Sequence, residues 1–140
     1  MAVKTLNPYL GFNGTAAKAI QFYEKALGAR TEHVMRWSDG PPEMKVPPEA
    51  RDRIMHAELT IGGGKLMASD APPHMPSPAD SNITVCLELD DNDDMKKKFD
   101  ALAAGGQVVM PIHDAFWGAT FGMLKDVYGI RWMFVGPKRQ

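Results

Sequence analysis

Hydrophobic and polar positions in the first half of the chain form short alternating runs around one helical stretch. Residues 6–12 alternate, with Leu10 and Phe12 on one face, which predicts a strand. Apolar residues then recur at helical spacing between Thr15, the expected N-cap, and Gly28, the expected stop. Three further alternating or apolar runs follow at residues 31–37, 53–61 and 65–69. The first half therefore predicts the element order βαβββ.

The second half repeats this order of elements. Residues 83–89 predict a strand, and residues 92–104 predict a helix for which Asp91 is the expected N-cap. The buried stripe of this helix is expected to consist of Met95, Phe99 and Leu102. Strands are predicted again at residues 107–112, 119–124 and 130–135.

An internal repeat supports the division into two similar halves. When one half is slid on the other, matched residues include Leu10 with Leu87, Phe12 with Leu89, Phe22 with Phe99, and Gly28 with Gly105. A long period of this kind indicates two copies of one supersecondary unit. The join is residues 71–78, where four prolines in eight residues can continue neither a helix nor a central strand. We expect an α+β domain made of two βαβββ modules, residues 1–75 and 76–140.

Composition and charge exclude several function classes. The chain has 140 residues, 44% hydrophobic and 24% charged, with a net charge of -1, so no broad basic surface is expected for nucleic acid or anionic membranes. No apolar run is long enough for a membrane span. Residues 1–7 lack the apolar stretch of a secretory signal, which favours a cytoplasmic location. The single cysteine, Cys86, is expected to be a small buried residue rather than a nucleophile.

Five segments carry a resemblance to a known family: Asn7-Pro8-Tyr9-Leu10-Gly11-Phe12-Asn13-Gly14, and residues 22–28, 55–59, 66–70 and 116–118. They resemble the PhnB-like branch of the glyoxalase, or vicinal oxygen chelate (VOC), superfamily over about residues 5–136. This branch is often labelled 3-demethylubiquinone 3-methyltransferase-like, although the chain has no glycine-rich strand-to-helix turn for S-adenosylmethionine. The resemblance implies paired βαβββ modules with curved mixed sheets around a cleft, commonly in a homodimer.

The resemblance also implies where a divalent metal would be held, at one point on the first and last strand of each module. Those points fall on Asn7, Met67, Thr84 and Met133. An amide, a hydroxyl and two thioethers include no imidazole, thiolate or carboxylate, which zinc and magnesium prefer. We therefore expect no metal and no cofactor. The alternative is a metal-dependent glyoxalase or dioxygenase-type enzyme in which His56, Glu58 or Glu88 replaces the missing ligands.

Strand parity indicates which side chains face the cleft. On the third predicted strand Met55, Ala57, Leu59 and Ile61 form an apolar face for the helix, so Ile54, His56, Glu58 and Thr60 point the other way. His56 and Glu58 are then neighbours, and are candidates for a catalytic base and the group that orients it. A hydrogen-bonded pair that only supports the sheet fits the same spacing.

The same parity argument places further residues on this side. Thr84, Cys86 and Glu88 are expected there from the fifth strand, and Arg131 and Met133 from the last strand. Residues 116–122 are aromatic and glycine-rich, and either wall a ligand pocket or cover the end of the core. The candidate ligand-binding residues are Asn7, Tyr9, Met67, Thr84, Glu88, Trp117, Arg131 and Met133. Together with His56 and Glu58 they predict a site for a small, partly apolar metabolite, on either a binding protein or an enzyme.

The first prediction concerns the dependence of the two modules on each other. Each predicted half has one helix for four strands, so that one face of its sheet would be bare if it folded alone. Residues 1–75 expressed alone are expected to lack a cooperative thermal transition. A cooperative, monomeric melt of this fragment would contradict the expected shared core.

Overall fold

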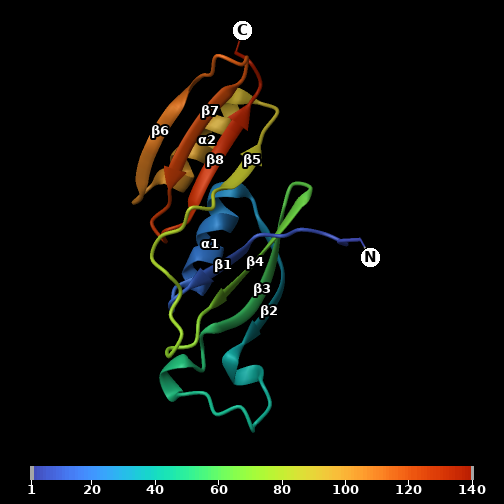
Figure 1. Ribbon diagram of the computed structural model, residues 1–140, viewed down its shortest axis with the longest axis vertical. Helices are drawn as coiled ribbons and strands as arrows, with labels where there is room; N and C mark the ends of the chain where they lie inside the picture. Colours follow the sequence, from blue (N-terminus) through green and yellow to red (C-terminus); the bar gives the residue numbers. More distant parts are fainter. Residues whose placement is uncertain (1, 140) are drawn as a thin grey trace. The chain divides into compact units, whose positions relative to one another are not determined.

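Residues 2–139 are described by a computed structural model, and they form two compact units that meet in sequence between Ser77 and Pro78. We call residues up to Ser77 the first module and residues from Pro78 onward the second module. Within the described residues, each module contains one α-helix and four strands in the order βαβββ (Figure 1). The predicted α+β class is therefore confirmed. Within the described residues, neither helix is long and apolar enough to cross a membrane.

The first module runs β1 (Tyr9–Phe12), α1 (Ala16–Leu27), β2 (Arg30–Arg36), β3 (Ile54–Ile61) and β4 (Gly64–Asp70). Two short 3-10 turns, η1 (Trp37–Asp39) and η2 (Pro48–Ala50), lie in the connection between β2 and β3. The second module runs β5 (Val85–Glu88), α2 (Asn92–Ala103), β6 (Gln107–Asp114), β7 (Thr120–Lys125) and β8 (Arg131–Gly136).

The two sheets have the same topology. The strand order is β1-β4-β3-β2 in the first sheet and β5-β8-β7-β6 in the second. The first and last strands of each module pair in parallel, and the other neighbours pair antiparallel. Each helix packs on one face of its own sheet (Figure 1). We call the other face, which the module's own helix does not cover, the open face.

The core of each module lies between its helix and its sheet. In the first module, the sheet contributes Leu10, Phe12, Ala57, Leu59, Leu66 and Ala68, and α1 contributes Ala16, Ala19, Ile20, Tyr23 and Leu27. In the second module, the expected stripe of Met95, Phe99 and Leu102 is buried, together with Leu124, Trp132 and Phe134. Burying a large apolar side chain stabilises the fold by about 1.5–3 kcal/mol. Gly122 permits a close approach here, because an added Cβ would lie 2.9 Å from the Phe99 ring.

Three local predictions are corrected by the structure. The first strand begins at Tyr9 rather than at residue 6. On β3 the pairing shifts between Met35 and Arg36, so Ile54 is buried and Met55 is half-exposed, the reverse of the expected parity at these two positions. From Ala57 onward the alternation follows the prediction, with Ala57 and Leu59 buried. A bulge explains the difference, since one extra residue moves the preceding side chains to the opposite face.

The third correction concerns the start of α1. Thr15 makes no side-chain capping bond. Instead, the buried carboxylate of Asp70, at the end of β4, accepts hydrogen bonds from the backbone N–H groups of Gly14 (2.8 Å), Ala16 (3.0 Å) and Ile54 (2.9 Å). The first two lie at the positive end of the helix, where a carboxylate is favoured. Asp70 therefore connects the end of β4 to the start of α1, at Gly14 and Ala16, and to the start of β3, at Ile54.

The second prediction tests this buried carboxylate. Asp70→Asn keeps the shape but removes the charge and presents an NH₂ group to backbone donors, so we expect a loss of about 3 kcal/mol in the free energy of unfolding. Urea denaturation of the whole chain measures it. Asp100→Asn, which removes an exposed ion pair with Lys96 on α2, is the control and should change stability by less than about 1 kcal/mol. Equal effects of the two variants would show that Asp70 is not a structural anchor.

Candidate functional site

One row of side chains crosses the open face of the first sheet. His33 on β2 pairs with Glu58 on β3, Glu58 pairs with Met67 on β4, and Met67 pairs with Tyr9 on β1. Directly paired residues point to the same face of a sheet. The row His33–Glu58–Met67–Tyr9 therefore spans all four strands of the first module.

A connected cluster of polar groups lies on this face. The Tyr9 hydroxyl is 3.0 Å from Nδ1 of His56, and Nε2 of His56 is 3.5 Å from Oε2 of Glu58. The other oxygen of Glu58 is 3.2 Å from the Lys65 ammonium. The side chains of His56 and Glu58 are 29% and 28% exposed, so both remain within reach of a small molecule. We call Tyr9, His56, Glu58 and Lys65 the polar cluster.

The electrostatics of the cluster keep Glu58 ionised. The hydrogen bond from Lys65 is the main cause that lowers the pKa of Glu58 below its ordinary value of 4.5, and His56 acts in the same direction. An ionised Glu58 favours the histidine tautomer that carries its hydrogen on Nε2. Nδ1 of His56 then accepts the hydrogen bond that the Tyr9 hydroxyl donates. The cluster is thus arranged so that a proton on Tyr9 can pass to a histidine supported by a carboxylate.

The structure brings together some of the predicted site residues and separates others along the chain. Tyr9, His56, Glu58 and Met67 share the open face of the first sheet, as strand parity predicts, and Asn7 lies just before β1. The remaining candidates, Thr84, Glu88, Trp117, Arg131 and Met133, belong to the second module. Trp117 lies in the loop between β6 and β7, where its ring packs on Phe121 at 5.6 Å.

Two residues depart from the sequence interpretation. Lys65 is not among the residues predicted from the sequence. It stands two residues before Met67 on β4 and so faces the same side, and this spacing alone predicts its position. Cys86 was expected to be buried but is exposed, on the open side of β5 next to Met133. Partial burial, with a smaller effect of Glu88, raises the pKa of the Cys86 thiol. This environment does not favour a reactive thiolate.

The four points at which the resemblance implies a metal do not fit one. Met67 and Met133 lie on the open sides of β4 and β8, and Asn7 and Thr84 lie just before β1 and β5. Their donor atoms are neutral amide, hydroxyl and thioether groups, which are poor ligands for a divalent ion. Among residues 2–139, no three side chains of His, Cys, Asp or Glu are grouped in a way that could hold a metal ion.

Comparisons with known proteins agree with this fold. A family model described as "Glyoxalase/Bleomycin resistance protein/Dioxygenase superfamily" matches residues 5–134. Protein YjdN of Escherichia coli is 32% identical over 146 aligned positions, which cover 96% of this chain and 97% of that protein. The crystal structure of protein PA1353 from Pseudomonas aeruginosa is 36% identical with a TM-score of 0.86, covering 98% of this chain and 100% of that one.

A more distant structure connects the fold with the resemblance seen in the sequence. The PhnB protein from Bacillus cereus, described as a putative 3-demethylubiquinone-9 3-methyltransferase, has a TM-score of 0.78. Its identity is 21%, over 95% of this chain and 99% of that one. At this identity the likeness shows the fold alone. The predicted resemblance to the glyoxalase superfamily is confirmed by the family model and by these folds.

The third prediction concerns the charge of Glu58. Lys65→Met removes the main hydrogen bond to the carboxylate, so the pKa of Glu58 should rise toward 4.5. A carbon-detected NMR titration of both proteins would measure this change. Because the pKa is lowered in the folded chain, the stabilisation by Glu58 is present above pH 4.5 and is lost as pH falls through the lowered pKa. Lys96→Met, on α2, is the control. An unchanged pKa in Lys65→Met would show that the lysine does not hold Glu58 ionised.

Proposed function

Because the chain belongs to the Glyoxalase/Bleomycin resistance protein/Dioxygenase superfamily, we propose that it binds a small metabolite on the open face of its first sheet, without the usual metal. The observation that carries the proposal is the polar cluster. One hydrogen bond of 3.0 Å, between Tyr9 and His56, and two ion-pair contacts of 3.5 and 3.2 Å, from Glu58 to His56 and to Lys65, connect these four side chains on a face that stays partly exposed. Small-molecule sites combine a few such convergent polar groups with apolar walls, which Met67 and the Tyr9 ring supply here.

The cluster also supports proton transfer to or from the bound molecule. A ligand that offers a weakly acidic proton to the Tyr9 oxygen would transfer it there as the phenolic proton moves to Nδ1 of His56. The resulting imidazolium keeps its Nε2–H directed at the Glu58 carboxylate, which stabilises the positive charge. Positioned groups of this kind contribute roughly 10²–10⁴-fold to a proton-transfer rate. The substrate class that fits is a small polar metabolite with an acidic C–H or O–H group.

The fourth prediction separates a role of His56 in binding from a role in stability. In His56→Ala, Glu58 keeps its ion pair with Lys65, so the melting temperature should change little. A metabolite thermal-shift screen on the wild-type chain identifies the ligand, because a ligand at 100 times its dissociation constant stabilises the fold by about 2.7 kcal/mol. His56→Ala should no longer bind the compound that stabilises the wild-type chain most.

His113→Ala is the matched control, since His113 is exposed and hydrogen-bonded to the Pro111 carbonyl in the second module. It should leave both stability and affinity unchanged. A large loss of stability in His56→Ala with unchanged affinity would mean that the histidine only supports the sheet.

The fifth prediction concerns the metal. After dialysis against a chelator and readdition of zinc, nickel or manganese, the purified protein should retain less than one equivalent, because neutral donors do not offset the dehydration of a divalent ion. Elemental analysis measures this. One equivalent of bound metal that disappears in Asn7→Ala or Met133→Ala would favour the metal-dependent alternative.

The proposal also includes a homodimer in the cytoplasm, with neither nucleic acid nor membrane as a partner. The dimer is supported by the resemblance to the PhnB-like branch, and the exclusion of nucleic acid by the net charge of -1. Light scattering during size-exclusion chromatography distinguishes one chain of 15.4 kDa from two.

A further inference from the structure

The open face of the second sheet is ordered into rows of different chemistry. At one end, Lys125 on β7 pairs with Arg131 on β8. The next row crosses all four strands and contains only sulfur-bearing side chains, Met110, Met123, Met133 and Cys86. Beyond it lie His113, Phe121, Val135 and Glu88. A pair of cations thus borders a polarisable, apolar strip that remains accessible, since Met110 is 39% exposed and Cys86 is exposed.

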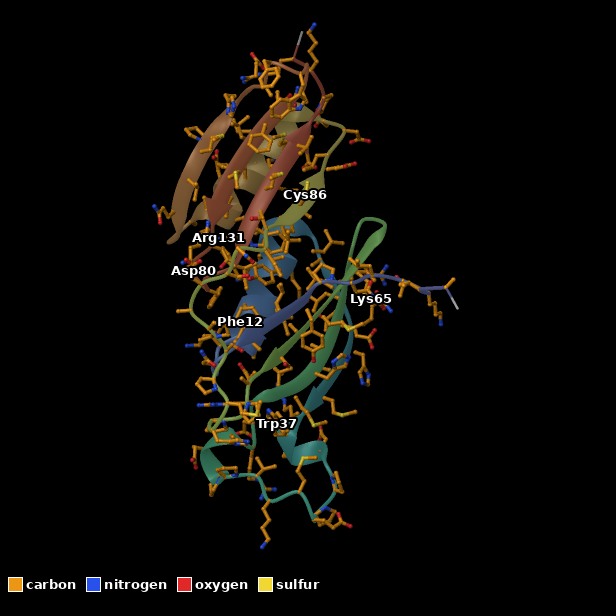
Figure 2. All side chains as sticks on the ribbon, viewed as in Figure 1. Phe12, Trp37, Lys65, Asp80, Cys86 and Arg131 are labelled. Carbon is orange, nitrogen blue, oxygen red and sulfur yellow. The ribbon has the colours of Figure 1, made fainter. Side chains whose placement is uncertain are left out.

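The two cations share one carboxylate. Asp80 lies beside Arg131 (Figure 2) and accepts two hydrogen bonds from it, from Nε at 3.1 Å and from Nη2 at 3.2 Å. The Asp80 carboxylate also lies 3.6 Å from the Lys125 ammonium. Like charges placed directly opposite each other on a sheet are destabilising, so the pair attracts an anion. With Asp80 in place, the group still carries one excess positive charge.

In both modules a basic residue on the last strand pairs with a carboxylate: Lys65 pairs with Glu58, and Arg131 pairs with Asp80. Glu58 lies on a strand of the first sheet, whereas Asp80 lies outside the second sheet. Lys65 stands two residues before Met67, as Arg131 stands two residues before Met133. Lys65 meets Glu58, which is carried by the neighbouring strand and pairs with Met67. Met133 pairs with Met123 on one side and with Cys86 on the other, and neither side chain is a carboxylate. Arg131 therefore obtains its carboxylate from outside the sheet.

Asp80 is not carried by a strand, and besides the two cations its carboxylate contacts the backbone N–H of Ser81, which donates a hydrogen bond to it at 2.9 Å. It lies in the irregular connection between β4 and β5, where residues 79–83 are all exposed. Exposed ion pairs are weak, and a ligand with two negative charges would satisfy both cations better than one carboxylate does. A fork of two N–H groups that binds a carboxylate also matches phosphate oxygens.

We propose that Lys125 and Arg131 form a binding site for a small organic anion, and that Asp80 occupies this site until the anion replaces it. The anionic head lies between the two cations, and the apolar body lies along Met123 and Met133. The class of ligand is a phosphate monoester or dicarboxylate with a small apolar body. The site uses no residue of the polar cluster, so it stands or falls independently of the proposed function.

Phenyl phosphate is the probe, because it combines a dianionic head with an apolar ring, and calorimetry on the whole chain measures its affinity. Asp80→Asn removes the competing carboxylate and should tighten binding by up to about fivefold, the range that a weak exposed ion pair allows. Arg131→Gln should weaken binding by about tenfold or more, since it removes a charge-assisted fork. Lys125→Gln should weaken it as well.

A matched control comes from the same module. Asp114→Asn frees Arg139 from an exposed ion pair of 2.8 Å that involves one arginine and one carboxylate, and it should leave the affinity unchanged. Thermal melts of every variant establish that it is folded.

The proposal is overturned if Asp80→Asn binds phenyl phosphate no more tightly than the wild-type chain, or if Arg131→Gln binds it equally well. Absence of binding by both wild-type and Asp80→Asn chains at millimolar ligand also overturns it. Inorganic phosphate tests the apolar part: it should bind more weakly than phenyl phosphate, and Met123→Ser should remove the difference. Equal affinities for the two phosphates would contradict a role for the thioether row.

Discussion

The buried carboxylate of Asp70 holds the first module together at the point where three of its segments meet. It accepts hydrogen bonds from the chain between β1 and α1, from the first turn of α1 and from the first residue of β3. A buried charge of this kind is stable only when its lone pairs are satisfied, and here backbone donors do so. By fixing Ile54 next to the end of β4, Asp70 sets the start of β3. The strand that follows then directs His56 and Glu58 to the open face.

The second module joins the same three segments with different chemistry. At the end of β8, Gly136 takes the position of Asp70, and an added Cβ there would lie 2.6 Å from the Thr120 hydroxyl and 2.8 Å from the Asn92 side chain. Thr120 donates a hydrogen bond that links β7 to Asn92 at the start of α2, at 2.9 Å. Asp91 caps α2 by accepting a hydrogen bond from the backbone N–H of Asp94, as predicted. The two modules therefore share one topology but connect the end of the last strand, the start of the helix and the neighbouring strand through different side chains.

Local spacing predicted most of the fold, because helices and strands have regular periods. The elements, their order and the side of Glu58 all follow from such periods. Contacts between residues distant in sequence could not be predicted in this way. The first backbone N–H of α1 donates its hydrogen bond to Asp70, which is 54 residues away from Ala16 in the sequence, and not to Thr15. The bulge that reverses the sides of Ile54 and Met55 depends on the pairing of β3 with β2. For the candidate site, parity found His56 and Glu58, but the hydrogen bond from Tyr9 requires the parallel pairing of β1 with β4.

The two open faces have diverged on this shared scaffold, since paired strand positions carry Glu58 and Tyr9 in one sheet but Met123 and Cys86 in the other. The central claim is that a ligand binds the open face of the first sheet, and methyl-labelled methionine NMR tests it most directly. During titration with the most stabilising compound of a metabolite screen, the Met67 signal should shift, because Met67 pairs with both Tyr9 and Glu58. The Met95 signal, from a fully buried residue of α2, should stay in place. Saturating binding that leaves Met67 unshifted would contradict the account.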